Sequence, residues 1–165
     1  MHKTPPILLL MLWIFAGAID AAQQAKLNPS AKSLSACTLV TKAEIEQAIG
    51  TVVGTAVQRQ VGKAYVCTYE NPKGNKVNIF IARAQGKRDL STLLVEAQKA
   101  LPQAKVRELP GIGEKALLVT DPKGGTILSV YRGGDSLVVS VYGISNNAKA
   151  ETAVEKISKK AFSRF

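Results

Sequence analysis

The chain of 165 residues contains one histidine, His2, and two cysteines, Cys37 and Cys67. His2 lies in a segment that we expect to be removed on export, so the mature protein would contain no imidazole. Catalysis by Ser-His-Asp or Cys-His groups and metal sites built on imidazole are thereby excluded. If the two cysteines are bonded to each other, no thiolate remains to bind zinc. We therefore predict no metal and no cofactor.

Carboxylates are the remaining groups for catalysis, and the chain has only 12 acidic residues. Nearly all of those in the mature chain fall at expected helix caps, turns or solvated faces. Cleavage of a glycosidic bond needs two acids that face each other, and only the three-dimensional structure can bring such a pair together. We expect a protein that is not an enzyme, with a carboxylate-based hydrolase as the alternative.

The hydrophobic run from Ile7 to Ile19 has 13 residues, fewer than the ~20 that a membrane-spanning helix needs. It follows a positive charge at Lys3 and precedes small residues, which is typical of a signal peptide. We expect residues 1–22 to be the signal peptide, with cleavage after Ala18 or Ala22. The mature protein would be periplasmic or secreted and would have no membrane span, whereas a retained anchor is the alternative.

Leu34-Ser35-Ala36-Cys37 matches the pattern of a lipobox, in which the cysteine is lipidated. A lipobox directly follows the apolar core because the peptidase acts at the membrane surface, but here a polar stretch, 20–33, intervenes. We therefore interpret Cys37 as bonded to Cys67, with lipidation as the less favoured alternative. The closed loop of about 30 residues would stabilise the fold by ~3–4 kcal/mol.

Negative charge is scarce, because 22 basic residues stand against the 12 acidic ones and the net charge is +10. A strongly basic exported protein is expected to associate with a polyanion, such as anionic lipid, lipopolysaccharide, teichoic acid or nucleic acid. A protein partner is a further candidate, and solubility alone is the simplest explanation. The candidate contacts flank the loop before the second expected helix and cluster at the C-terminal end: Arg83, Lys87, Arg88, Lys156, Lys159, Lys160 and Arg164.

The small and polar residues 23–35 are expected to form a flexible tether, and residues 36–165 a single domain. The first helix of this domain carries clear signals at both ends. Thr41 and Glu44 have the spacing of a capping box, and Gly50 suits the left-handed residue that ends a helix.

Periodicity and turn residues predict the other elements. Strands are expected at 51–60, 65–70, 76–83, 104–109, 115–120, 126–132 and 136–143, and helices at 90–101 and from a cap at 145 or 146 to about 162. The order α-β-β-β-α-β-β-β-β-α, with tight turns between the strands, predicts an α+β domain with a mainly antiparallel sheet.

The stretch Leu109 to Ala116, L-P-G-I-G-E-K-A, resembles the turn of helix-hairpin-helix domains. In those domains the turn and the N-terminus of the following helix present backbone N–H groups to a DNA phosphate. The alternative function is therefore extracytoplasmic DNA binding through Gly111, Gly113 and Lys115. It requires a helix at 114–121, and a strand there would contradict it.

The same residues, taken with the rest of the chain, carry a second resemblance. C-x-L-V-T-x-x-E-I-x-x-x-I-G at Cys37 to Gly50, C-x-Y at Cys67 to Tyr69 and L-P-G-I-G-E-x-A at Leu109 to Ala116 occur in this order. The chain thus resembles an uncharacterised family of exported bacterial proteins and lipoproteins, a domain of unknown function. The resemblance implies a small α+β domain with bridged cysteines, similar to the PsbP-like α/β/α sandwich, and implies no catalytic residues.

Overall fold

The computed structural model describes residues 35–62, 64–71, 74, 76–83, 90–123 and 125–165. The expected signal peptide and nearly all of the expected tether lie outside the described residues. The described residues belong to one compact unit. None of the helices in these ranges combines the length and the apolar character needed to cross a membrane.

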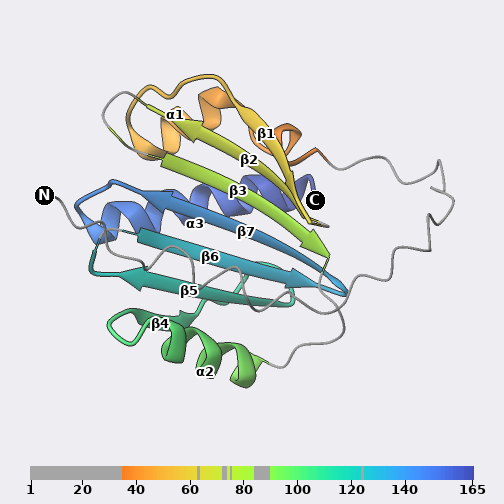
Figure 1. Ribbon diagram of the computed structural model, residues 1–165, viewed down its shortest axis with the longest axis vertical. Coiled ribbons are helices and arrows are strands. Elements are labelled where there is room, and N and C mark those ends of the chain that lie inside the picture. The colour runs from red at the N-terminus through yellow and green to blue at the C-terminus, as the bar shows by residue number, and fades with distance from the viewer. Residues whose placement is uncertain (1–34, 63, 72–73, 75, 84–89, 124) are drawn as a thin grey trace, which may run out of the picture. The chain divides into compact units, whose positions relative to one another are not determined.

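A seven-stranded antiparallel sheet forms the centre of this unit, with the strand order β1-β2-β3-β7-β6-β5-β4 (Figure 1). The first three strands form one meander, the last four form another, and the pairing of β3 with β7 joins them. The strands are β1 (Val57–Val61), β2 (Ala64–Glu70), β3 (Lys76–Arg83), β4 (Lys105–Glu108), β5 (Lys115–Asp121), β6 (Gly125–Arg132) and β7 (Asp135–Tyr142). The predicted α+β class and order of elements are confirmed.

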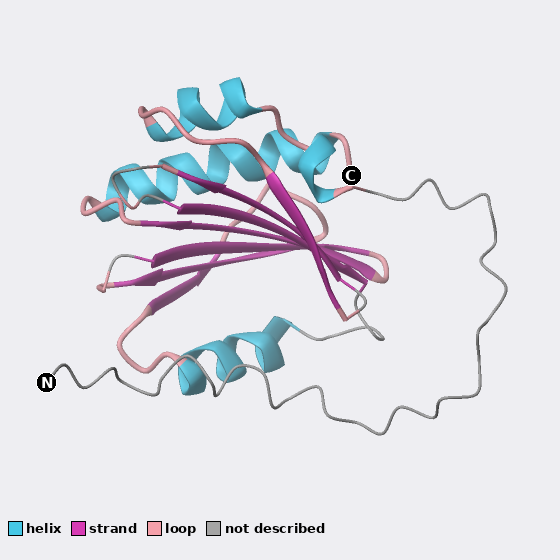
Figure 2. Ribbon diagram, turned by 45° about the horizontal axis from the view of Figure 1, so that its top comes forward, coloured by secondary structure: helices cyan, strands magenta, loops and turns pink. Residues whose placement is uncertain are grey.

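Helices cover both faces of the sheet, which makes the layers α/β/α (Figure 2). On one face, α3 (Asn147–Ser163) packs across β6 and β7, and α1 (Lys42–Ile49) packs against α3. On the other face, α2 (Leu90–Ala100) packs mainly over β4 and β5. One face of the sheet is therefore covered by two helices, and the other only in part.

Strand alternation explains this layering, because successive side chains of a strand point to opposite faces. In β7, Leu137, Val139 and Val141 are buried in the core together with α3 residues such as Val154 and Ile157. A smaller cluster of Leu93, Ala104, Leu117 and Val119 fills the space under α2.

The start of α1 is as the sequence predicts. Thr41 accepts a hydrogen bond from the Glu44 amide, and the Glu44 carboxylate accepts one from the Thr41 amide at 2.9 Å, so the capping box is complete. Gly50 ends the helix in the left-handed conformation, with φ of 72°. The predicted disulfide is also present, and it joins the 3₁₀ turn at Ala36–Thr38 to β2 through Cys37 and Cys67.

The predicted strand at 51–60 is wrong in its first half, because β1 begins only at Val57. Val53 is drawn into the core, where its amide donates to the Glu46 carboxylate at 3.0 Å. The amide of Gly54 then donates to the carbonyl of Glu70 at 2.6 Å, outside the regular ladder. These contacts pull the segment out of extended pairing. The other predicted elements differ from the observed ones by at most one residue at either end.

Candidate functional site

Three lysines form a stripe along α3. Lys149, Lys156 and Lys160 are all exposed, and their spacing places them within about 40° of one another around a helix of 3.6 residues per turn. Lys149 and Lys160 are about 16 Å apart along the helix axis, at 1.5 Å per residue. In the part of the chain that the structure describes, their ammonium groups have no carboxylate partner. We call these three residues the α3 lysine stripe.

An open depression of about 490 Å³ lies between α1 and α3, beside this stripe. α1 contributes Glu44, Gln47 and Ala48 to its lining, and the residues that α3 contributes include Lys156 and Lys160. Two unpaired cations thus border a hollow that also has an apolar part. Such a surface can hold a negatively charged group by charge and hydrogen bonds, but the lining contains no nucleophile with an adjacent base.

Helix stability explains only part of the stripe. Lys160 lies in the last turn of α3, where a positive charge is favourable beside the negative end of the helix dipole. Lys149 is the third residue of the same helix, and its charge there is opposed by the positive end of the dipole. The position of Lys149 therefore needs an explanation other than the stability of the helix.

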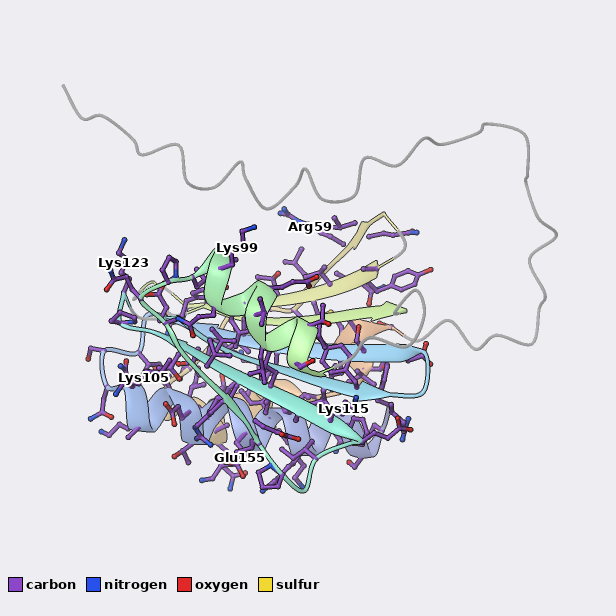
Figure 3. The ribbon with its side chains drawn as sticks, turned by 90° about the horizontal axis from the view of Figure 1, so that it is seen from below. Arg59, Lys99, Lys105, Lys115, Lys123 and Glu155 are labelled. Atoms are coloured by element: carbon purple, nitrogen blue, oxygen red, sulfur yellow. A yellow bond between two sulfur atoms is a disulfide. The ribbon has the colours of Figure 1, made fainter. Side chains whose placement is uncertain are left out.

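Two of the cations predicted as contacts are engaged within the protein. The guanidinium of Arg164 donates to both carboxylate oxygens of Glu44 at 2.7 Å and to the carbonyl of Leu39 at 2.9 Å. The ammonium of Lys159 lies 2.6 Å from the carboxylate of Glu155, which Figure 3 labels on α3. The charges of Arg164 and Lys159 are therefore largely neutralised by acids of the same protein.

The Glu44–Arg164 pair shifts the pKa of both groups. Hydrogen bonds from Arg164 and from the Thr41 amide lower the pKa of Glu44 from 4.5 to about 2. The hydrogen bond to Glu44 raises the pKa of Arg164 above its usual value. Both groups stay charged at neutral pH, so this pair is a structural contact between α1 and the C-terminal end.

The remaining predicted contacts precede α2. Arg83 ends β3, where its backbone is opposite Asp135 of β7. The side chain of Arg83, together with Lys87 and Arg88, lies outside the described residues. Among the predicted cations, the structure therefore brings together those of α3 and the C-terminal end.

The Gly-rich turn between β4 and β5 is an element of the core. Ile112 is 3% exposed, and the Glu114 amide donates to the carbonyl of Tyr131 at 3.0 Å. Gly113 has a positive φ of 65°, and a Cβ atom there would lie 2.6 Å from the side chain of Val130. Close packing against β6 thus requires glycine at this position.

The helix-hairpin-helix interpretation of this turn is wrong in its geometry. Residues Lys115–Asp121 form β5, a strand that pairs with β4 and β6 in the sheet, so the turn lacks the helix N-terminus that would face a DNA phosphate. Gly111 and Gly113 both have positive φ, and they belong to the turn of the β4–β5 hairpin. Lys115 begins β5 and is half-buried.

Several carboxylates are held in ion pairs. Burial raises the pKa of Glu151, but the hydrogen bond from Thr120 at 2.8 Å and the contact with Arg107 at 3.0 Å outweigh it, and the net shift is downward. Glu70 pairs with Lys76, which lowers the pKa of Glu70. Within the described ranges, no three acidic, cysteine or histidine side chains converge to hold a metal ion.

Sequence reasoning missed Lys149 as a member of the site. The signal was present, because positions 149, 156 and 160 follow the spacing of one helix face.

Comparisons of the chain with models of protein families, with curated proteins and with solved structures find no match. The resemblances to the exported bacterial family and to the PsbP-like sandwich therefore stay predictions.

Proposed function

We propose that this chain is an exported binding domain, without enzymatic activity, that recognises a polyanion of the cell envelope through the α3 lysine stripe. The observation that supports it most directly is that Lys149, Lys156 and Lys160 are aligned, exposed and without a carboxylate partner among the described residues, whereas the neighbouring Arg164 and Lys159 are bonded to acids. The net charge of +10 would draw a polyanion to the protein, and the stripe would position it.

An extracytoplasmic location, periplasmic or secreted, fits this proposal. The disulfide between Cys37 and Cys67 is typical of an oxidising compartment, and the hydrophobic run at Ile7 to Ile19 is typical of a signal peptide. The order of the motifs from Cys37 to Ala116 supports kinship with the exported bacterial family. In that setting the accessible polyanions are phosphate-bearing lipids and lipopolysaccharide.

Binding should be tested with the oxidised chain from residue 23 to 165 and vesicles that contain phosphatidylglycerol. Each lysine near an anionic surface contributes about 1 kcal/mol. The variant K149Q/K156Q/K160Q should therefore bind on the order of 100-fold more weakly than the unmodified protein. Vesicles of phosphatidylcholine alone should not bind either protein.

The matched control is K99Q/K105Q/K123Q, which removes three exposed lysines of other elements, all labelled in Figure 3. It has the same net charge as the stripe variant and should retain most of the binding. Equal weakening of the two variants would show that net charge alone is responsible. Lipopolysaccharide and duplex DNA, measured in parallel across a salt series, would distinguish an envelope ligand from a nucleic acid.

A further inference from the structure

The two edges of the sheet differ in how they are protected. β4 has only four residues, carries Lys105, Arg107 and Glu108, and packs against α2. β1, at the opposite edge in Figure 1, is exposed at all five positions, and no strand among the described residues pairs with its outer side. Charges and a covering helix are the usual protection against edge-to-edge pairing. The short 3₁₀ turn at Ala36–Thr38 contacts β1, but none of the α-helices in the described ranges covers this strand.

The register of the β1–β2 hairpin shows which backbone groups of β1 face outward. A two-residue loop joins Val61 to Ala64, so these two residues form a hydrogen-bonded pair. Hydrogen-bonded and non-hydrogen-bonded pairs alternate along an antiparallel ladder. The N–H and C=O groups of Gln58 and Gln60 therefore point away from β2, toward any strand that would add to this edge.

The side chains of β1 define what kind of strand would fit. Val57, Arg59 and Val61 lie on one face of the sheet, and Val57 and Val61 are 47% and 50% exposed. This is the face that α2 leaves partly open, and a hollow of about 450 Å³ there is lined by residues that include Arg59, Val61 and Val66. An added strand would need apolar residues opposite Val57 and Val61. Between these two residues, it would need one whose side chain tolerates the positive charge of Arg59.

A second copy of the chain meets this requirement poorly. The sequence of β1, V-Q-R-Q-V, reads the same in both directions. An antiparallel copy would therefore place Val57 opposite Val61, but it would also place Arg59 opposite Arg59 of the second copy. Like charges directly opposite each other are destabilising. Arg59 thus acts against self-pairing of an otherwise self-complementary edge.

We propose that β1 binds an extended segment of a partner protein as an additional antiparallel strand, and that Arg59 selects an acidic residue flanked by apolar residues at alternate positions. An acidic side chain opposite Arg59 replaces the repulsion of the self-paired register with attraction. The surplus of positive charge on the chain, +10 in total, favours the same kind of partner. This proposal concerns a different surface from the α3 lysine stripe and is independent of it.

The test uses the oxidised chain 23–165 and the peptide Thr-Val-Thr-Glu-Thr-Val-Thr, capped at both ends. NMR should show that the amides of Gln58 and Gln60 shift and become protected from hydrogen exchange when the peptide binds. A peptide with Lys in place of the central Glu should bind about fivefold to tenfold more weakly. N-methylation of the two threonines next to the central residue should abolish binding, because it removes the N–H groups that face Gln58 and Gln60.

The variant Arg59→Glu should reverse the preference, so that the Lys-centred peptide binds more tightly. Lys99→Glu changes the charge at an exposed lysine of α2, which lies at the other end of the sheet from β1 (Figure 1), and should leave the preference unchanged. Equal binding of the two peptides, a preference that survives Arg59→Glu, or unprotected Gln58 and Gln60 amides would each overturn the proposal. Dimerisation of the unmodified chain through β1 in sedimentation would overturn it as well, since a second copy would then occupy the edge.

Discussion

Replacement of Glu44 by Gln tests how the C-terminal end is held to the rest of the domain. The Glu44 carboxylate receives two hydrogen bonds from the Arg164 guanidinium, both at 2.7 Å, and one from the Thr41 amide at 2.9 Å. Arg164 lies 120 residues away in the sequence. This one carboxylate therefore joins the start of α1 to the end of α3.

The magnitude follows from the lowered pKa of Glu44. A change from 4.5 to about 2 corresponds to about 3 kcal/mol, at 1.36 kcal/mol for each pKa unit. The Glu44 side chain is 21% exposed and that of Arg164 is 40% exposed, so water and salt screen part of the interaction. We expect Glu44→Gln to lower the free energy of unfolding by about 1–2 kcal/mol at pH 7.

The sign of the pH dependence is fixed by the direction of the shift. A carboxyl whose pKa is lower in the folded protein stabilises the fold above the pKa of the unfolded chain, here 4.5. This stabilisation should be complete above about pH 5 and should be lost as the pH falls from 4.5 toward 2. Glu44→Gln cannot titrate, so the difference between the two proteins should shrink over the same range.

Urea unfolding followed by circular dichroism, at pH 7 and at steps down to about pH 2, measures this difference. Glu155→Gln is the control, because it breaks an exposed pair with Lys159 one helical turn away. It should cost only about 0.3–0.5 kcal/mol. If Glu44→Gln costs no more than Glu155→Gln, or if its cost does not change with pH, the pair between α1 and the C-terminal end contributes nothing beyond a surface contact.

Three further predictions concern the core. Reduction of the Cys37–Cys67 disulfide should lower the free energy of unfolding in urea by about 3 kcal/mol, because it releases a loop between residues 30 apart in sequence; an unchanged midpoint would contradict this. Gly113→Ala should lower the melting temperature in calorimetry by several degrees, since its Cβ would lie 2.6 Å from a β6 side chain. Tyr69→Phe should cost about 1–2 kcal/mol in urea unfolding, because it leaves the Val40 carbonyl without the hydroxyl that donates to it at 2.9 Å.

The sequence alone determined the elements whose signals are local. Thr41, Glu44 and Gly50 specify both ends of α1 because a capping box and a left-handed glycine act within a few residues. Turn residues separate β5, β6 and β7, and the alternation within these strands places their core faces. The pairing of the only two cysteines followed from their number.

Only the tertiary structure decided what depends on contacts distant in the sequence. The ladder between β3 and β7 sets the strand order, and it joins residues that no local pattern connects. The sequence suggests Arg164 as a cation available to a ligand. The fold instead places its guanidinium against the carboxylate of Glu44, which neutralises its charge. The placement of α2 over β4 and β5 decides which face of the sheet stays open beside β1. Side-chain packing between elements determines these features. The local pattern of residues along the chain does not show which distant elements will pack together.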